Sequence, residues 1–185
     1  TLLDTAWADD IDEYANHLSY SICRAGTRNE DFEIPADIYI TNTDAVKWLA
    51  EQRKKFFDKF DTVIVDEISS FKHRTSQRSK ALNKIKKHFT YREGLTGTPT
   101  PKSITDIWNQ INFLDDGERL GNEFFRFRQA VCTPVQVGPK INMIEWRDKP
   151  GAEEAVAKLI TENKVRHQFA AGMENPPNTT HNTKQ

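Results

Sequence analysis

The sequence has few of the features that would anchor or cross-link a protein. It contains two cysteines in 185 residues, Cys23 and Cys132, far apart and outside any C-x-x-C pair. This spacing argues against a disulfide framework or a zinc site and suits a reducing cytoplasm. No apolar run approaches the length of a membrane-spanning helix, and the first residues lack the basic start and apolar core of a signal peptide. We therefore expect neither a membrane span nor a signal peptide.

An excess of charge of either sign is also missing. The chain has 26 Lys and Arg against 27 Asp and Glu, a net charge of -1, so no global field attracts nucleic acid or an anionic membrane. Any nucleic-acid contact must come from local patches. With 37% apolar and 29% charged residues, the composition is that of one globular domain with a core. An initiator methionine is absent, so Thr1 is expected to be an internal starting point.

Hydrophobic periodicity predicts alternating strands and helices. Strands are expected at 19–23, 37–41, 62–66 and 91–95, and helices at 6–17, 44–60, 76–88, 103–114, 124–131 and 155–160. Residues 24–35 and most of 133–150 are expected to form loops, with an edge strand at 141–146, and residues from 172 a loose tail. Such alternation is typical of βαβ units and a parallel sheet. Four strands are few for an open sheet, so we expect the sheet to be incomplete.

The most informative stretch is an apolar strand that ends in two acids. Val63–Val65 is short and β-branched, which favours a strand buried on both faces, and Asp66 and Glu67 follow at its carboxyl end. Open parallel sheets bind their ligands at that edge. A hydrated Mg²⁺ carrying nucleotide phosphates would compensate the two carboxylates. The alternative is a polar pair that simply ends a strand.

A second motif follows the last predicted strand of this group. In Gly94–Pro99 two hydroxyl residues, Thr96 and Thr98, flank Gly97 in a tight turn. These hydroxyls can bond a carboxylate or a phosphate at the neighbouring strand end. For this segment alone, an ordinary Gly-Pro turn is the favoured interpretation.

A basic stretch separates the two motifs. Lys72–His88 contains nine Lys, Arg and His residues and no acid. It could face phosphates, but a solvated helix face is the favoured interpretation. Cys23 and Cys132 are expected to be buried apolar residues, and tryptophans on apolar stripes to be core.

The order of these motifs resembles motifs II and III of superfamily 2 helicases, most closely those of the Snf2 branch. Asp66–Lys72 is similar to the Snf2 form of motif II, and Leu95–Pro99 to motif III. Ile40–Asp44 is similar to motif Ib, Thr5–Trp7 to the end of motif Ia, and Leu120–Cys132 to the start of the Snf2 insertion. The resemblance implies an α/β fold of the RecA-like, P-loop NTPase type. This is a three-layer α/β/α parallel sheet, here incomplete at its N-terminus.

The resemblance also implies roles for individual residues. Asp66 would hold Mg²⁺ through water, and Glu67 would orient the water that attacks the γ-phosphate of ATP. Thr96, Gly97 and Thr98 would couple the nucleotide site to the nucleic-acid face. DNA would be contacted through its backbone, independently of sequence, by four residues: Thr41, Asn42, Thr43 and Lys72. The function implied is ATP-driven movement on DNA, with ATP and Mg²⁺ as cofactors.

Departures from the family pattern limit this interpretation. The Gly-x-x-x-x-Gly-Lys-Ser/Thr loop and a second RecA-like lobe with arginine fingers are not found in these 185 residues, and Thr100–Lys102 replaces the usual Leu-Gln-Asn. We expect a partial first RecA-like domain at 1–132, a Snf2-type insertion or linker at 133–171, and a tail at 172–185. The isolated chain is expected not to hydrolyse ATP appreciably. Similarity to the compact Snf2-like helicases of bacteriophages implies the cytoplasm of a bacterial host.

Two other functions remain open at this point. The chain could be a non-catalytic helicase-like scaffold that binds nucleic acid and never had the phosphate-binding loop. It could also be a metal-dependent nuclease that uses Asp66 and Glu67, although such a site needs further converging carboxylates. The sequence offers no convincing third carboxylate, so the nuclease ranks below the others.

Overall fold

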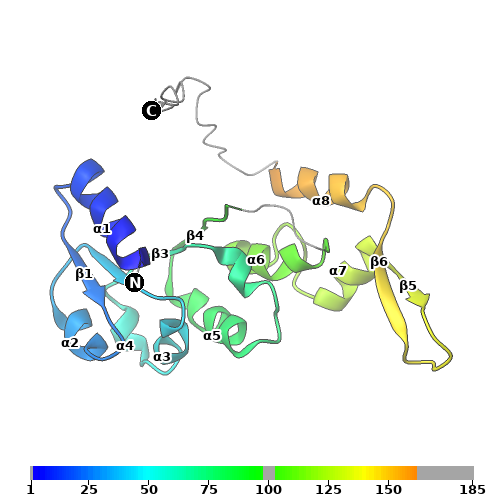
Figure 1. Cartoon of the computed structure of the whole chain (residues 1–185), viewed down its shortest axis with the longest axis horizontal. Coiled ribbons are helices and arrows are strands. Elements are labelled where there is room, and N and C mark those ends of the chain that lie inside the picture. Colours follow the sequence, from blue (N-terminus) through cyan, green and yellow to red (C-terminus); the bar gives the residue numbers. More distant parts are fainter. Residues whose placement is uncertain (1, 98–102, 162–185) are drawn as a thin grey trace, which may run out of the picture.

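The computed structural model describes residues 2–97 and 103–161. The first part of the chain alternates helices and strands (Figure 1): α1 (Leu2–Tyr14), β1 (Tyr20–Cys23), α2 (Arg28–Glu33), β2 (Ile38–Thr41), α3 (Ala45–Leu49), α4 (Lys54–Phe57), β3 (Thr62–Val65), α5 (Gln77–Ile85) and β4 (Tyr91–Gly94). Short 3-10 turns follow β3 (Ile68–Phe71) and α5 (Lys86–His88). The rest comprises α6 (Asp106–Asp115), α7 (Phe124–Val131), β5 (Cys132–Gln136), β6 (Ile144–Asp148) and α8 (Ala152–Thr161).

The four expected strands pair in parallel. β1 pairs with β2, with Tyr20 opposite Ile38, and β3 pairs with β4, with Thr62 opposite Tyr91. Each pair is joined by a crossover that contains a helix, which confirms the predicted βαβ units. Within the described residues the two pairs are separate two-stranded sheets. The carboxyl ends of β3 and β4 therefore lie side by side.

The prediction that β3 is buried on both faces is wrong. Val65 is buried, but the side chain of Ile64 on the opposite face is 49% exposed. Successive side chains of a strand point to opposite faces, so only the Val65 face is packed against the core. The acids that follow are accordingly not in a dry site, since Asp66 is half-buried and Glu67 is exposed.

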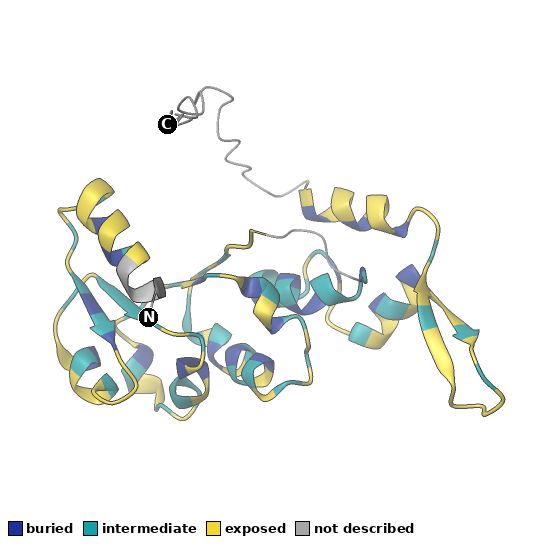
Figure 2. Ribbon diagram, in the orientation of Figure 1, coloured by how far each residue is buried: buried dark blue, intermediate teal, exposed yellow. Residues whose placement is uncertain are grey.

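Two clusters of buried side chains form the core, and α6 contributes to both (Figure 2). The first cluster surrounds β3 and α5 and includes Val65, Ile68, Phe71, Leu82 and Phe113. The second joins α6, α7 and α8 and includes Trp108, Ile111, Phe127, Val131 and Val156. Cys23 and Cys132 are buried free thiols, as expected.

Three regions differ from the expected elements. Residues 24–35 contain α2, which buries Phe32, where a loop was expected. The helix expected at 44–60 is two helices, because α3 ends at Leu49 and the backbone of Arg53 is extended before α4. Residues 133–150 were expected to be loop apart from an edge strand at 141–146. That strand is present as β6, and it pairs in an antiparallel hairpin with β5, which was not expected, with Pro134 opposite Trp146. Within the residues described, no helix is both long and apolar enough to cross a membrane.

Candidate functional site

The ends of β3 and β4 are held together by backbone hydrogen bonds. The Leu95 amide donates to the Val65 carbonyl, and the Ile68 amide donates to the Leu95 carbonyl, both at 2.9 Å. Gly94 permits this close approach, because a Cβ at that position would lie 2.6 Å from Cδ1 of Ile68. The two sequence motifs therefore form one structural unit at the carboxyl edge of the β3–β4 pair.

Glu67 stands at the turn that ends β3. Its backbone is left-handed, with φ of 49°, which is uncommon for a residue with a side chain. The Ser69 hydroxyl donates to its Oε1, and the Thr96 hydroxyl donates to the same oxygen at 3.2 Å. The hydrogen bond from Ser69, and then those from Thr96 and the Gly97 backbone, hold the pKa of the Glu67 carboxyl below its ordinary value. Glu67 is thus an exposed, ionised carboxylate in a fixed orientation.

Asp66 is held from the other side. The indole Nε1 of Trp7 donates to its Oδ2 at 3.2 Å, and the Glu67 amide donates to its Oδ1 at 2.9 Å. A carboxylate has about four acceptor positions, so two hydrogen bonds leave room for the water shell of a cation. Mg²⁺ is typically bound through one or two carboxylates, waters and substrate phosphates. The donor set therefore fits a hydrated Mg²⁺ that arrives with a nucleotide.

The turn after Glu67 is tied to α5 and α6 by a buried polar network. The Phe71 carbonyl accepts from the Ser79 hydroxyl at 2.9 Å and from the Asn109 amide group at 2.7 Å, and both residues are almost fully buried. Lys72 forms an ion pair with Asp106 at 3.7 Å. Because α6 follows the Thr96–Gly97 turn in the chain, this network joins the two motifs a second time.

The residues predicted to contact nucleic acid make contacts within the chain. The Thr41 hydroxyl donates to the Cys23 carbonyl at 3.0 Å, and the Asn42 side chain accepts from the Ala45 amide at 3.1 Å. Asn42, rather than Asp44, therefore caps the start of α3 with its side chain.

Thr43 is linked to the basic stretch, because its hydroxyl accepts from Nη2 of Arg78 at 2.5 Å. The carboxylate of Asp44 lies 3.5 Å from Nε of the same arginine. Lys72, the fourth predicted contact, is paired with Asp106. All four residues thus have a partner within the chain.

Three of the other basic side chains also make contacts within the chain. Lys84 donates to the Ala50 carbonyl at 2.6 Å, and Lys86 pairs with Asp116 at 2.9 Å. The His88 ring stacks on Phe57, with centroids 4.3 Å apart. For these residues the basic stretch is a structural face and not a free phosphate-binding patch.

Two residues that bind the carboxylates of the site were not predicted to do so. Ser69 lies two residues after Glu67, and a 3-10 turn brings its hydroxyl back to that carboxylate. Trp7 comes from α1, and no local pattern in the sequence indicates that it reaches Asp66. Thr98, predicted to couple the motifs, lies outside the described residues. Among residues 2–97 and 103–161, no group of three or more His, Cys, Asp or Glu side chains is placed to hold a metal ion, so the carboxylates that a nuclease would need do not converge there.

Comparisons with known proteins agree with this arrangement. The putative protein p41 of Acyrthosiphon pisum secondary endosymbiont phage 1 is 37% identical over 107 residues, covering 55% of this chain and 23% of the phage protein. An uncharacterized ATP-dependent helicase of Mycoplasma genitalium is 25% identical over 136 residues, covering 64% and 12%. The DNA repair protein RAD5 of Gibberella zeae is 34% identical over 80 residues, covering 43% and 7%. The chain thus spans less than a quarter of each relative.

Among solved structures, the SWI2/SNF2 ATPase core of Sulfolobus solfataricus in complex with dsDNA matches with a TM-score of 0.61 and 22% identity, covering 84% of this chain and 30% of that one. This likeness confirms the predicted α/β fold of RecA-like type. The family model of the SNF2-related domain matches residues 1–182, which is nearly the whole sequence. The chain belongs to the SNF2-related domain family.

Proposed function

We propose that this chain supplies part of the first motor domain of an ATP-dependent DNA translocase or helicase of the Snf2 type. The observation that carries the proposal is the pair of carboxylates at the end of β3, with Glu67 bound by Thr96 from the end of β4. Ser69 of the first motif and Thr96 of the second thus both donate to Oε1 of Glu67. Family membership and the relatives named as helicases support the same assignment.

In this proposal the two carboxylates have different tasks. Asp66, with its oxygens oriented by Trp7 and the Glu67 amide, would hold the water shell of Mg²⁺. Bound Mg²⁺ would neutralise charge on the β- and γ-phosphates of ATP. Glu67 would accept a hydrogen bond from the attacking water and orient it toward the γ-phosphate. Ionisation suits this task, because an ionised carboxylate only accepts hydrogen bonds.

Thr96 and Gly97 are proposed to couple the nucleotide site to DNA. Thr96 binds Glu67, and the chain continues from this turn to α6, whose Asn109 and Asp106 contact the segment after motif II. A change in the position of Glu67 on ATP hydrolysis would therefore move α6 and Lys72 through these contacts. Thr41, Asn42, Thr43 and Lys72 are proposed to contact the DNA backbone, and the solved SWI2/SNF2 ATPase core in complex with dsDNA supports DNA as the partner.

The proposed motor needs a phosphate-binding loop and a second lobe that these 185 residues do not contain. The division into a motor domain at 1–132, an insertion at 133–171 and a tail at 172–185 is part of the proposal. So is action inside a bacterial host cell, which the phage relative supports. The alternative is a non-catalytic helicase-like scaffold that binds nucleic acid. Sequence upstream of Thr1 separates the two, since a Gly-Lys-Thr loop supports the motor.

The test is Glu67→Gln in the protein encoded by the whole gene. The amide keeps the shape of the side chain but removes its charge. We expect ATP hydrolysis to fall by about a hundredfold or more, while binding of a fluorescent ATP analogue is kept. Steady-state ATPase measurements with and without duplex DNA report the first property, and fluorescence anisotropy reports the second.

A matched control is Glu145→Gln, because Glu145 is an exposed carboxylate in β6 that pairs with the nearby Arg147. This variant should turn over ATP like the parent protein. Normal turnover by Glu67→Gln would refute the catalytic assignment. If Glu67→Gln loses both nucleotide binding and ATP turnover, Glu67 has a structural role instead.

A further inference from the structure

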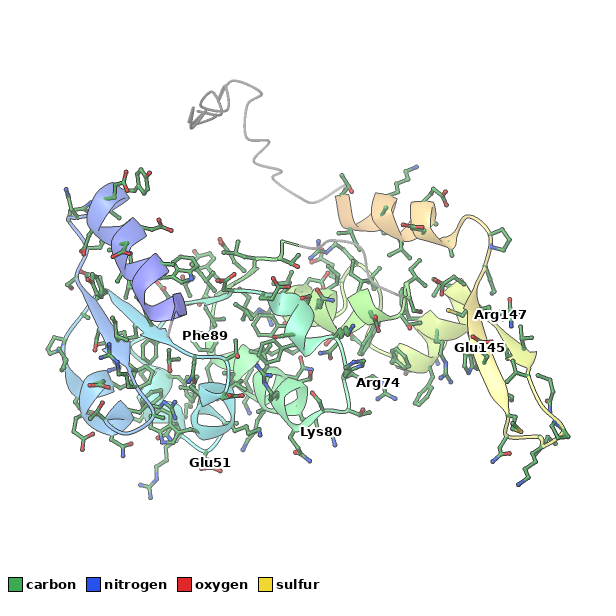
Figure 3. The ribbon with its side chains drawn as sticks, viewed as in Figure 1. Glu51, Arg74, Lys80, Phe89, Glu145 and Arg147 are labelled. Atoms are coloured by element: carbon green, nitrogen blue, oxygen red, sulfur yellow. The ribbon has the colours of Figure 1, made fainter. Side chains whose placement is uncertain are left out.

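A surface on which arginines stack on aromatic rings lies apart from the β3–β4 edge. Arg74 precedes α5, Phe124 and Phe125 begin α7, Arg128 lies one turn later, and Trp146 belongs to β6. We call these five residues the arginine–aromatic surface. Arg74 is labelled in Figure 3, where it lies between α5 and α7. Segments distant in sequence thus meet at one place.

The stacking distances are short. The guanidinium carbon of Arg74 lies 4.4 Å from the centroid of Phe124 and 4.9 Å from that of Phe125. The guanidinium carbon of Arg128 lies 5.2 Å from Phe125 and 4.0 Å from Trp146. Such contacts fix the plane of a guanidinium but use its face, so its N–H edge stays available for hydrogen bonds.

Neither stacked arginine is neutralised by an acid. In the part of the chain that the structure describes, no ion pair joins a carboxylate to Arg74 or Arg128, and Nε of Arg128 is buried without an acceptor, so only the terminal nitrogens of Arg128 can meet a ligand. Arg126, on the same helix, is by contrast paired with Glu123 at 2.9 Å. The side chain of Phe125 is 56% exposed. The surface therefore presents two oriented, unneutralised guanidinium groups beside an open aromatic ring.

Phosphate is the ligand group that this arrangement fits. Arginine offers a rigid fork of donors that matches phosphate oxygens, and stacking reduces the freedom that must be lost on binding. We propose that the arginine–aromatic surface binds phosphates of duplex DNA, outside the contacts made by the start of α3. The proposal rests on the proposed function only for its choice of DNA as the phosphate source.

The place of the surface favours a continuous path for DNA. Arg74 lies in the turn that precedes α5, four residues before Arg78, and Arg78 donates to Thr43 at the proposed motif Ib contact. The segment that carries Arg74 thus connects that contact to α7. Figure 1 shows α3, α5 and α7 following one another along the molecule. A duplex that meets Thr43 can therefore continue past Arg74 toward Arg128.

The test measures DNA binding by the 185-residue chain without nucleotide. The probe is a fluorescein-labelled duplex of about 30 base pairs, titrated by anisotropy between about 50 and 200 mM salt. We expect Arg74→Gln and Arg128→Gln each to weaken binding by about tenfold. Each should also lower the slope of log affinity against log salt by about 0.9, the value for one lost phosphate contact.

Arg126→Gln is the matched control, because it removes the same charge from the same helix but from an arginine already paired with Glu123. We expect it to change the affinity less than twofold. Arg128→Lys keeps the charge but not the planar stack, and should restore the salt slope while recovering affinity only in part. Near-ultraviolet circular dichroism confirms that each variant keeps its tertiary packing.

Three outcomes would overturn the proposal. The first is unchanged DNA affinity of both glutamine variants, and the second is an equal loss of affinity with Arg126→Gln. The third is a loss of affinity by the glutamine variants for a single-stranded probe of the same length with none for the duplex. The result is independent of the Glu67→Gln assay, because no ATP is turned over. Failure here leaves the proposed motor function intact, and failure of the ATPase test leaves the DNA-binding result intact.

Discussion

Asp116 is the residue whose contribution to stability can be worked out most fully from the structure. It ends α6 in the left-handed conformation, with φ of 56°, and accepts from Arg92 at 2.6 Å and from Lys86 at 2.9 Å. The hydrogen bond from Arg92, and then that from Lys86, lower the pKa of the Asp116 carboxyl from 3.8 to about 2. The carboxylate thus fastens β4 and the turn after α5 to the end of α6.

The magnitude follows from this pKa. A fall from 3.8 to about 2 corresponds to at most about 2.4 kcal/mol, at about 1.36 kcal/mol for each pKa unit. Because the side chain of Asp116 is 59% exposed, solvent screening reduces the contribution to about 1 kcal/mol. For a protein of this size that is a change in Tm of about 2–4 °C. Asp116→Asn isolates the charge, since asparagine tolerates the left-handed backbone.

The sign of the pH dependence is fixed by the direction of the pKa change. The folded-state pKa is below the unfolded value, so the stabilisation is complete above about pH 4 and is lost as the pH falls toward about 2. Urea unfolding of the parent chain and of Asp116→Asn should therefore differ by about 1 kcal/mol at pH 7 and converge in acid.

The control for this experiment is Glu123→Gln. Glu123 also pairs with an arginine, but both side chains are mostly exposed, at 64% for Glu123 and 83% for Arg126, so we expect no measurable change in stability. A difference between the parent chain and Asp116→Asn that stays constant from pH 7 to acid would refute the reasoning. So would equal stability of the two at pH 7.

Two further predictions concern the β3–β4 edge. Trp7→Phe removes the donor to Asp66 and should raise the Mg²⁺ concentration for half-maximal ATP turnover by about tenfold in the whole protein; an unchanged Mg²⁺ dependence in a folded variant would contradict this role. Gly94→Ala places a Cβ 2.6 Å from Cδ1 of Ile68 and should destabilise the chain by about 1 kcal/mol or more. Adding Ile68→Val, which removes Cδ1, should recover part of that loss in thermal unfolding, and no recovery would show that the clash is not the cause.

The strands of the site could be predicted because their signals are local. A β-branched run followed by Asp66 and Glu67 specifies both the strand and its end, and Gly94–Gly97 marks the neighbouring turn. Parallel pairing followed from the helical segments between the strands. The contact between Thr96 and Glu67 was accessible to the same reasoning, because carboxyl ends of paired parallel strands share one edge.

Other features depend on contacts that no local pattern contains. α2 is a polar segment, and its helical form depends on Phe32, which packs against Tyr39, Trp48 and Phe56 from later elements. The break between α3 and α4 was hidden because apolar residues continue across it at helical spacing. β5 was missed because Pro134 disfavours a strand, yet this proline lies opposite Trp146 in a two-stranded hairpin.

Glu67 has a left-handed backbone conformation that glycine or asparagine would adopt at a lower free-energy cost. A left-handed conformation costs an ordinary side chain about 1–2 kcal/mol, glycine almost nothing, and asparagine less than most. Neither glycine nor asparagine supplies a carboxylate. Substitutions that relieve the backbone at this position therefore remove the group that the proposed chemistry needs. Selection for stability alone would favour replacement of Glu67 and so remove the carboxylate. A thermostable form of the motor therefore has to gain its stability elsewhere in the chain.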